Sequence, residues 1–214
     1  MKNIFTAFLL MLSTSTFAVD FTGNLSYTND YLWRGMSQGN GPAWQTGIDV
    51  KQNFGNYQVY AGAWTSEVEF GENNREVDVY AGAVIPIMEN LYFDMGYVDY
   101  DFNDEQSDFS EWKIGGWYDL SWGGQLLGYL YQTDVESYET KDETATLTYL
   151  HPTSLPIINN VKFKIEYTYF QQNETMVMLG MMKELGNGFN FSVMAGEDMM
   201  TKGKLVSGKL TFNF

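Results

Sequence analysis

Hydrophobic and polar residues alternate along most of the chain. The alternation is clearest over residues 76–85, 112–120 and 161–168. A period of two is typical of β-strands because successive side chains point to opposite faces. The pattern predicts an all-β protein with about twelve antiparallel strands. The predicted strands span residues 20–33, 43–54, 57–66, 75–85, 91–101, 110–120, 125–133, 143–150, 161–171, 175–185, 189–196 and 203–214. Two of them, 125–133 and 175–185, are apolar on both faces, so the sequence leaves their phase open.

The amino terminus has the features of a secretory signal peptide. Lys2 is positively charged, residues 4–12 are apolar, and Thr16 and Ala18 supply small residues before a cleavage site. We predict a signal peptide over residues 1–18 and one mature domain over residues 19–214. The alternative is that residues 4–12 form a buried strand of a cytoplasmic protein. The predicted mature chain has no cysteine and no further apolar run of about eighteen residues, so neither disulfides nor a transmembrane helix are expected.

The spacing of the predicted strands favours a membrane barrel over a soluble sandwich. The mature chain of 196 residues (214 minus 18) gives about sixteen residues per strand and connection, whereas sandwich strands recur about every 8–12 residues. Short turns are expected on one rim and longer polar loops on the other, as in outer-membrane barrels. The predicted turns are 55–56, 86–90, 121–124, 186–188 and a longer connection at 151–160; the predicted outer loops are 34–42, 67–74, 102–109, 134–142, 172–174 and 197–202.

Composition narrows the possible partners. The chain has a net charge of −15, which argues against nucleic acid because phosphates must be neutralised by clustered lysine and arginine. Aromatic residues make up 17% of the chain, and aromatic residues are enriched at membrane interfaces. Seventeen of the 27 acids, Glu111 among them, fall in or beside the predicted outer loops. These acids could keep the loops solvated, attract cations, or bind divalent ions that bridge to lipopolysaccharide.

The last strand ends on an aromatic carboxy-terminal residue, Phe214. It resembles the closing strand of bacterial outer-membrane barrels, which is recognised by the barrel assembly machinery. The resemblance implies an outer-membrane location in a Gram-negative bacterium, with Phe214 as an assembly signal and with outer-membrane lipid and lipopolysaccharide as surroundings.

A motif follows the first predicted strand. Residues 29–47 include Trp33-Arg34-Gly35, Ser37-Gln38 and Pro42-Ala43, and Gly62-Ala63-Trp64 follows downstream. Together with the terminal phenylalanine, these residues are similar to the Gcw_chp family of uncharacterised bacterial envelope proteins, whose members are often labelled TorF-family porins. The resemblance implies an outer-membrane barrel; it supplies no substrate and no catalytic residues.

Within this motif, two roles are open for Arg34. It could anchor the first outer loop by pairing with a neighbouring carboxylate, or it could reach into the pore mouth and set solute preference. We treat Trp33, Arg34, Gly35, Ser37 and Gln38 as the candidate pore-mouth motif.

If Phe214 marks the lipid face, alternation assigns a charged and aromatic set to the lumen. Both signs of charge occur in it, so the side chains could line a water path or pair into a network that blocks it. Twelve strands lie between small filled barrels and wide porins, so strand number leaves both cases open. The lumen or constriction candidates are Asp49, Lys51, Tyr60, Trp64, Glu76, Asp78, Tyr80, Asp94, Lys113, Trp117, Asp119, Lys162, Lys164, Glu166 and Lys209.

Catalysis has little support in the sequence. The single histidine, His151, is expected in a periplasmic connection, and no Gly-x-Ser-x-Gly elbow accompanies it. We expect no enzyme activity, cofactor or metal site. The sequence favours a porin for passive diffusion of small hydrophilic solutes or cations, and the alternative is a closed outer-membrane barrel with a structural or surface-interaction role.

Overall fold

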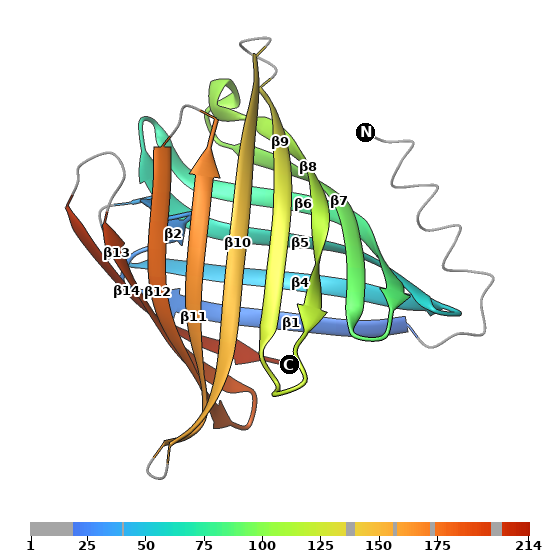
Figure 1. Cartoon of the computed structure of the whole chain (residues 1–214). Helices are drawn as coiled ribbons and strands as arrows, with labels where there is room; N and C mark the ends of the chain where they lie inside the picture. The colour runs from blue at the N-terminus through green and yellow to red at the C-terminus, as the bar shows by residue number, and fades with distance from the viewer. Residues whose placement is uncertain (1–18, 40, 136–139, 156–157, 172–173, 198–202) are drawn as a thin grey trace.

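A computed structural model describes residues 19–39, 41–135, 140–155, 158–171, 174–197 and 203–214. Twelve antiparallel strands form a closed barrel, as predicted, and a separate two-stranded hairpin lies apart from it in the sheet pairing (Figure 1). Within the described residues, no helix is long and apolar enough to cross a membrane. The predicted signal peptide, residues 1–18, lies outside the described part.

The barrel strands are consecutive neighbours except where the hairpin intervenes between β1 and β4. They are β1 (Val19–Thr28), β4 (Ala43–Phe54), β5 (Tyr57–Phe70), β6 (Asn73–Met88), β7 (Leu91–Phe102), β8 (Phe109–Asp119), β9 (Gln125–Val135), β10 (Thr140–Leu155), β11 (Ile158–Phe170), β12 (Glu174–Gly186), β13 (Phe189–Glu197) and β14 (Lys204–Asn213). The hairpin consists of β2 (Leu32–Trp33) and β3 (Met36–Ser37), and a short 3₁₀ helix η1 (Glu105–Ser107) joins β7 to β8.

Strands β1 and β14 close the barrel. They pair from Asn24 with Asn213 to Thr28 with Lys209. One residue further, Gly23 N–H donates to Phe214 O at 2.8 Å, and Phe214 N–H donates to Gly23 O at 3.0 Å. The Phe214 ring lies over Gly23, where a Cβ would meet it. Closure matters because lipid cannot hydrogen-bond a free strand edge.

Replacing Phe214 with alanine is expected to lower the yield of assembled barrel several-fold, because the ring covers the seam where the first and last strands meet. The yield is measured from the mobility difference between unheated and heated protein on detergent gels. Phe21→Ala is the matched control, since Phe21 is also a lipid-facing aromatic, 71% exposed against 68% for Phe214. Equal yields of the two variants would contradict this role.

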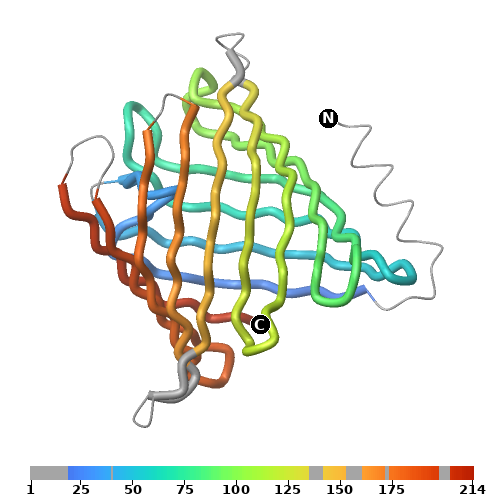
Figure 2. Tube along the Cα trace, in the orientation of Figure 1, coloured from blue at the N-terminus to red at the C-terminus, as the bar shows by residue number. Residues whose placement is uncertain are grey.

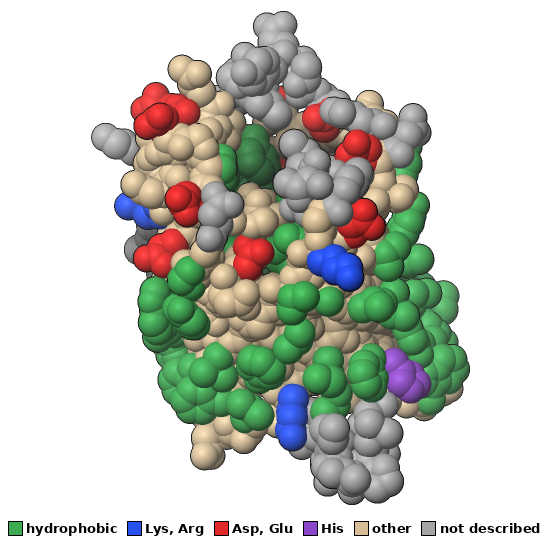
Figure 3. All heavy atoms as spheres, turned by 90° about the vertical axis from the view of Figure 1, so that its left-hand side faces the viewer, with side chains coloured by type: hydrophobic (Ala, Val, Ile, Leu, Met, Phe, Trp, Pro, Cys, Tyr) green, Lys and Arg blue, Asp and Glu red, His purple; other side chains and the backbone are tan. Residues whose placement is uncertain are grey.

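The outer surface of the barrel is apolar and its inner surface is largely polar. Outward positions include exposed Trp44, Ile48 and Leu130, whereas Ser26 and Gln45 face inward and are buried. Figure 3 shows hydrophobic side chains gathered in a band over one face, with acidic side chains clustered toward one end. Such a band matches the hydrocarbon layer that a membrane barrel must face.

Register settles the phase of the two strands that are apolar on both faces. In β9, Leu126 and Leu130 point outward and Tyr129 points inward, because Tyr129 pairs with inward-facing Gly115. In β12, Val177 and Leu179 face lipid, whereas Met178 pairs with inward-facing Glu166 and is buried.

Several predicted connections are in fact strand. Between β5 and β6, the predicted loop 67–74 reduces to a turn at Gly71 and Glu72. The strands extend because Val68 and Phe70 continue the inward alternation and pack in an apolar cluster with Phe102. The predicted loops 86–90 and 134–142 are likewise shortened, because β6 runs to Met88 and β10 begins at Thr140.

The predicted connection at 151–160 is also largely wrong. β10 continues to Leu155 and β11 begins at Ile158, so His151 lies within a strand, opposite Phe163. The His151 side chain is exposed on the outward face, and its Nδ1 is 2.8 Å from the hydroxyl of Tyr149.

Candidate lumen constriction

A first outer loop is predicted at 34–42, but its residues 34–39 fold toward the barrel interior. Its tip is a two-residue turn at Arg34 and Gly35, with φ values of 48° and 81°, between the paired strands β2 and β3. Positive φ at both central residues is the geometry of tight hairpins, and glycine adopts it without strain. We call residues 29–39 the crossing hairpin; it is the blue segment behind the orange strands on the left of Figure 2.

The crossing hairpin spans the lumen. It starts from β1, yet its tip contacts Glu111 of β8 and packs against Met176 of β12. Strand β9, whose Thr133 shares the contact with Glu111, lies six strands from β1 in either direction around the ring. The hairpin therefore reaches the opposite wall.

Hydrogen bonds hold the stem of the hairpin. Gln38 N–H donates to Tyr31 O at 2.8 Å, and Glu69 N–H donates to Gln38 O at 2.8 Å. The Ser37 hydroxyl donates to an Asp30 carboxylate oxygen at 2.6 Å. Tyr31 packs edge-on against Trp64, with ring centroids 5.5 Å apart. Two motif residues, Ser37 and Gln38, thus fix the hairpin rather than line an external loop.

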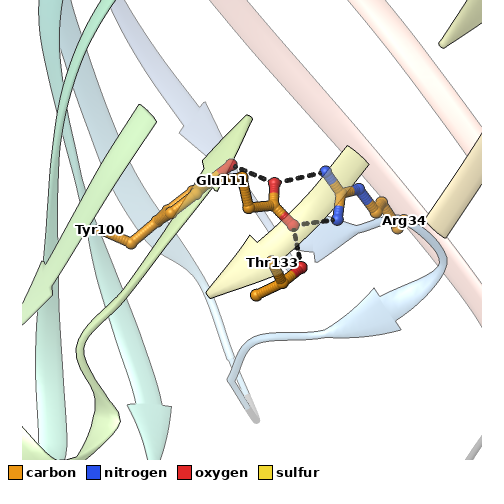
Figure 4. A network of polar contacts seen from close by, with 4 residues as sticks. All are labelled: Arg34, Tyr100, Glu111 and Thr133. Atoms are coloured by element: carbon orange, nitrogen blue, oxygen red, sulfur yellow. Dashed lines mark hydrogen bonds and ion pairs between the residues drawn. The ribbon is translucent and has the colours of Figure 1, made fainter. Parts of the chain in front are cut away.

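Arg34 forms the main contact at the tip. Its two terminal nitrogens donate to the two oxygens of Glu111 at 2.8 and 2.7 Å (Figure 4). Glu111 also accepts from Thr133 Oγ1 at 2.7 Å and from the Tyr100 hydroxyl at 3.1 Å. Four donors on one carboxylate satisfy it fully, which a buried charge requires.

The surroundings of this ion pair are aromatic. The Arg34 guanidinium lies 4.3 Å from the centroid of the Trp33 ring and 3.9 Å from that of Tyr131. The Glu111 side chain is 0% exposed. Arg34 does pair with a carboxylate, as one of its two interpretations proposed, but the pair lies inside the barrel. Counting Glu111 among solvated outer-rim acids was wrong, because it shares the inward face of β8 with Lys113.

A second network joins the wall from β5 to β9. Asp94 accepts from the Tyr60 hydroxyl at 2.8 Å, from the Tyr129 hydroxyl at 3.1 Å and from Lys113 Nζ at 2.8 Å. Asp94 is 4% exposed. Tyr60 reaches it across β6, where Gly82 leaves room for the phenol ring. The network therefore ties non-adjacent strands on this side of the lumen.

Two carboxylates near the hairpin are less well satisfied. Glu76 Oε2 and Asp78 Oδ1 are buried and have no hydrogen-bond partner among the described residues. The two residues follow each other on the inward face of β6, opposite Ser66 and Trp64. Both acids therefore face the lumen close to the crossing hairpin.

The opposite side of the lumen holds a cavity of about 260 Å³. It lies between the crossing hairpin and strands β11 to β14, and both charged and apolar side chains line it. We call it the lysine cavity. Its lining includes Thr28, Asp30, Tyr31, Arg34, Gln45, Trp64, Lys164, Glu166, Met178, Met182, Met194, Ser192, Ser207 and Lys209.

Register places all fifteen lumen candidates on the inward face. Some form pairs: Tyr80 donates to Asp49 at 2.7 Å, and Lys164 contacts Glu166 at 2.7 Å. Four of them, Trp64, Lys164, Glu166 and Lys209, line the lysine cavity. Others lie toward the opposite end. Lys162 and Asp119 line a separate cavity of about 230 Å³, Trp117 stacks on Tyr92, and Lys51 pairs with Tyr60 in the strand register.

Sequence reasoning missed several side chains of the constriction. Glu111 could have been found by extending the alternation of Lys113 back by two residues. Met178 and Met182 could not, because β12 is apolar on both faces and its phase depends on pairing with β11. Met194 lies on β13, on the same face as Ser192.

These features define a bacterial outer-membrane β-barrel: twelve closed strands, an apolar outer band and a charged lumen narrowed by an inward hairpin. Two solved structures share the fold. The KdgM porin in complex with disordered oligogalacturonate is 8% identical, with a TM-score of 0.59 and coverage of 91% of this chain and 98% of that one. The COG4313 outer membrane channel from Pseudomonas putida F1 is 10% identical, with a TM-score of 0.54 and coverage of 94% and 97%.

The family follows from the sequence comparison. The family described as "Bacterial protein of unknown function (Gcw_chp)" matches residues 13–193, and the chain belongs to it. This confirms the resemblance found in the Trp33-Arg34-Gly35 motif. No functionally curated protein matches the chain.

Proposed function

We propose that this protein is an outer-membrane porin for passive diffusion of small hydrophilic solutes. The observation that carries the proposal is the lysine cavity, which adjoins the crossing hairpin inside the barrel and has charged and polar walls. The hairpin narrows the lumen and leaves this side as the route for a solute. A lumen lined by fixed charges selects solutes by size and charge.

Small cations are included in the proposal. The chain carries a net charge of −15, and acidic side chains gather toward one end of the barrel (Figure 3). A negative field at a pore entrance raises the local concentration of cations. The same acids would bind divalent ions that bridge to lipopolysaccharide, and Phe214 would be recognised by the barrel assembly machinery.

The proposal is a channel and not an enzyme. The two structures of similar fold are channels by their names. His151 points outward from β10, away from the lumen where a hydrophilic substrate would lie. Its position does not suit it as a general base for such a substrate.

A second function is supported by the crossing hairpin itself. The buried Arg34–Glu111 pair fixes the hairpin across the lumen, which favours a closed barrel with a structural or surface-interaction role.

Planar lipid bilayers separate the two functions. Purified full-length protein is added to one side in KCl, and detergent without protein is the control. We expect stepwise current increases that scale with salt concentration and a reversal potential, under a salt gradient, that indicates cation preference. Silence over many insertions of protein that is folded by gel mobility would refute the porin and support the closed barrel.

A further inference from the structure

Lys209 is a partly buried ammonium with no carboxylate partner. Its Nζ lies 3.4 Å from Gln45 Oε1, a neutral acceptor at a long distance. Among the described residues, the salt bridges are those of Arg34, Lys113 and Lys164, and none includes Lys209. A charge removed from water without a counter-charge is costly, so an anion beside Lys209 would be stabilised.

The charges around Lys209 also favour an anion beside it. Lys164 is near enough for its like charge to repel that of Lys209. Glu166 does not relieve it, because its carboxylate is engaged by Lys164 at 2.7 Å. Asp30 also lines the cavity, and its carboxylate accepts a hydrogen bond from the Ser37 hydroxyl at 2.6 Å. Lys209 is therefore the lysine of this cavity whose Nζ forms no ion pair with a carboxylate of the described residues, and the like charge of Lys164 lies on the same cavity wall.

The rest of the cavity wall is suited to an apolar group. Met178, Met182 and Met194 line one side, and Trp64 lines another. Methionine side chains are flexible and polarisable, so they pack against varied apolar shapes and against aromatic rings. A volume of about 260 Å³ accommodates a small organic molecule.

We infer that the lysine cavity binds small organic carboxylates. The carboxylate contacts Lys209 beside Lys164, and the apolar body packs against the three methionines and Trp64. This inference adds one class of solute, small organic carboxylates, to those of the proposed channel, and it rests on the proposed function for its route of entry. The binding site itself exists whether or not the lumen conducts.

Three ligands of similar size test how ligand charge affects binding: anionic benzoate, neutral benzamide and cationic benzamidinium. Each is titrated calorimetrically into the detergent-solubilised full-length protein. We expect benzoate to bind at least about tenfold more tightly than benzamide, since a hydrogen bond to a charged group contributes about that factor. Benzamidinium should bind least well.

Lys209→Met should weaken benzoate binding by about tenfold or more, because it keeps the length of the side chain and removes its charge. Lys162→Met is the matched control, since Lys162 also faces the lumen but lines the other cavity. If Lys209→Met fails to assemble, Lys209→Gln replaces it. Equal benzoate affinity in the wild type and in the Lys209 variant would overturn the inference, as would equal affinity for benzoate and benzamide.

Bilayer currents keep this inference separate from the proposed function. Current in KCl, with a partial block by benzoate that Lys209→Met removes, supports both. Current without selective benzoate binding overturns the inference and leaves the porin standing. Selective benzoate binding to a protein that never conducts supports the site and refutes the porin.

Discussion

Replacing Arg34 with methionine is expected to destabilise the barrel by about 3–5 kcal/mol, because it leaves Glu111 as an unpaired carboxylate inside the protein. Glu111 would retain only the Thr133 and Tyr100 hydroxyls as donors. The released hairpin should also raise single-channel conductance. Stability is measured by denaturant unfolding of the protein refolded into lipid vesicles, and conductance in planar bilayers.

Two further variants test the mechanism of this effect. Arg34→Met combined with Glu111→Gln should recover part of the lost stability, because the second change removes the unpaired charge. Arg75→Met is the control, since Arg75 is the other arginine of the chain and is exposed. If Arg34→Met changes stability and conductance no more than Arg75→Met does, the Arg34–Glu111 pair does not hold the hairpin.

Replacing Asp94 with leucine should have the second large effect. The change removes the shared acceptor of Tyr60, Tyr129 and Lys113, and leaves the Lys113 ammonium without its carboxylate. Loss of one partner of a buried ion pair costs about 3–5 kcal/mol. The same unfolding measurement in vesicles gives the size of the effect.

Asp119→Leu provides the comparison for Asp94. Asp119 also faces the lumen, but among the described residues its carboxylate accepts only from Gln125 of the adjacent strand, at 2.7 Å. The Asp119→Leu substitution should lower the free energy of unfolding by about 1 kcal/mol, the usual contribution of a single hydrogen bond. Similar losses for the two variants would show that the Asp94 network does not tie the wall together.

The barrel was predictable from the sequence because each strand carries its own evidence. One face must meet lipid and the other must not, so apolar residues recur at every second position. On the assumption that Phe214 faces lipid, alternation within each strand predicted Lys113, Glu166 and Lys209 on the inward face. The ends of the strands were harder to predict. Val68 and Phe70, for example, continue the alternation beyond the predicted strand 57–66.

The crossing hairpin was not predictable in the same way. Trp33-Arg34-Gly35 is short, and the Glu111 carboxylate that pairs with Arg34 lies 77 positions further along the chain. Nothing local distinguishes an arginine in a loop from an arginine aimed across a lumen. The choice depends on a carboxylate that only the closed ring brings opposite.

The Arg34–Glu111 pair can form only when the sheet is curved into a barrel. The hairpin that carries Arg34 follows β1, an edge strand of the unrolled sheet, whereas Glu111 lies on β8 in the middle of that sheet, so rolling the sheet into a cylinder brings the two side chains together. Formation of this contact therefore reports that the sheet has curled, even before its two edges have joined. We therefore expect the crossing hairpin to take its place across the lumen while the barrel wall is forming.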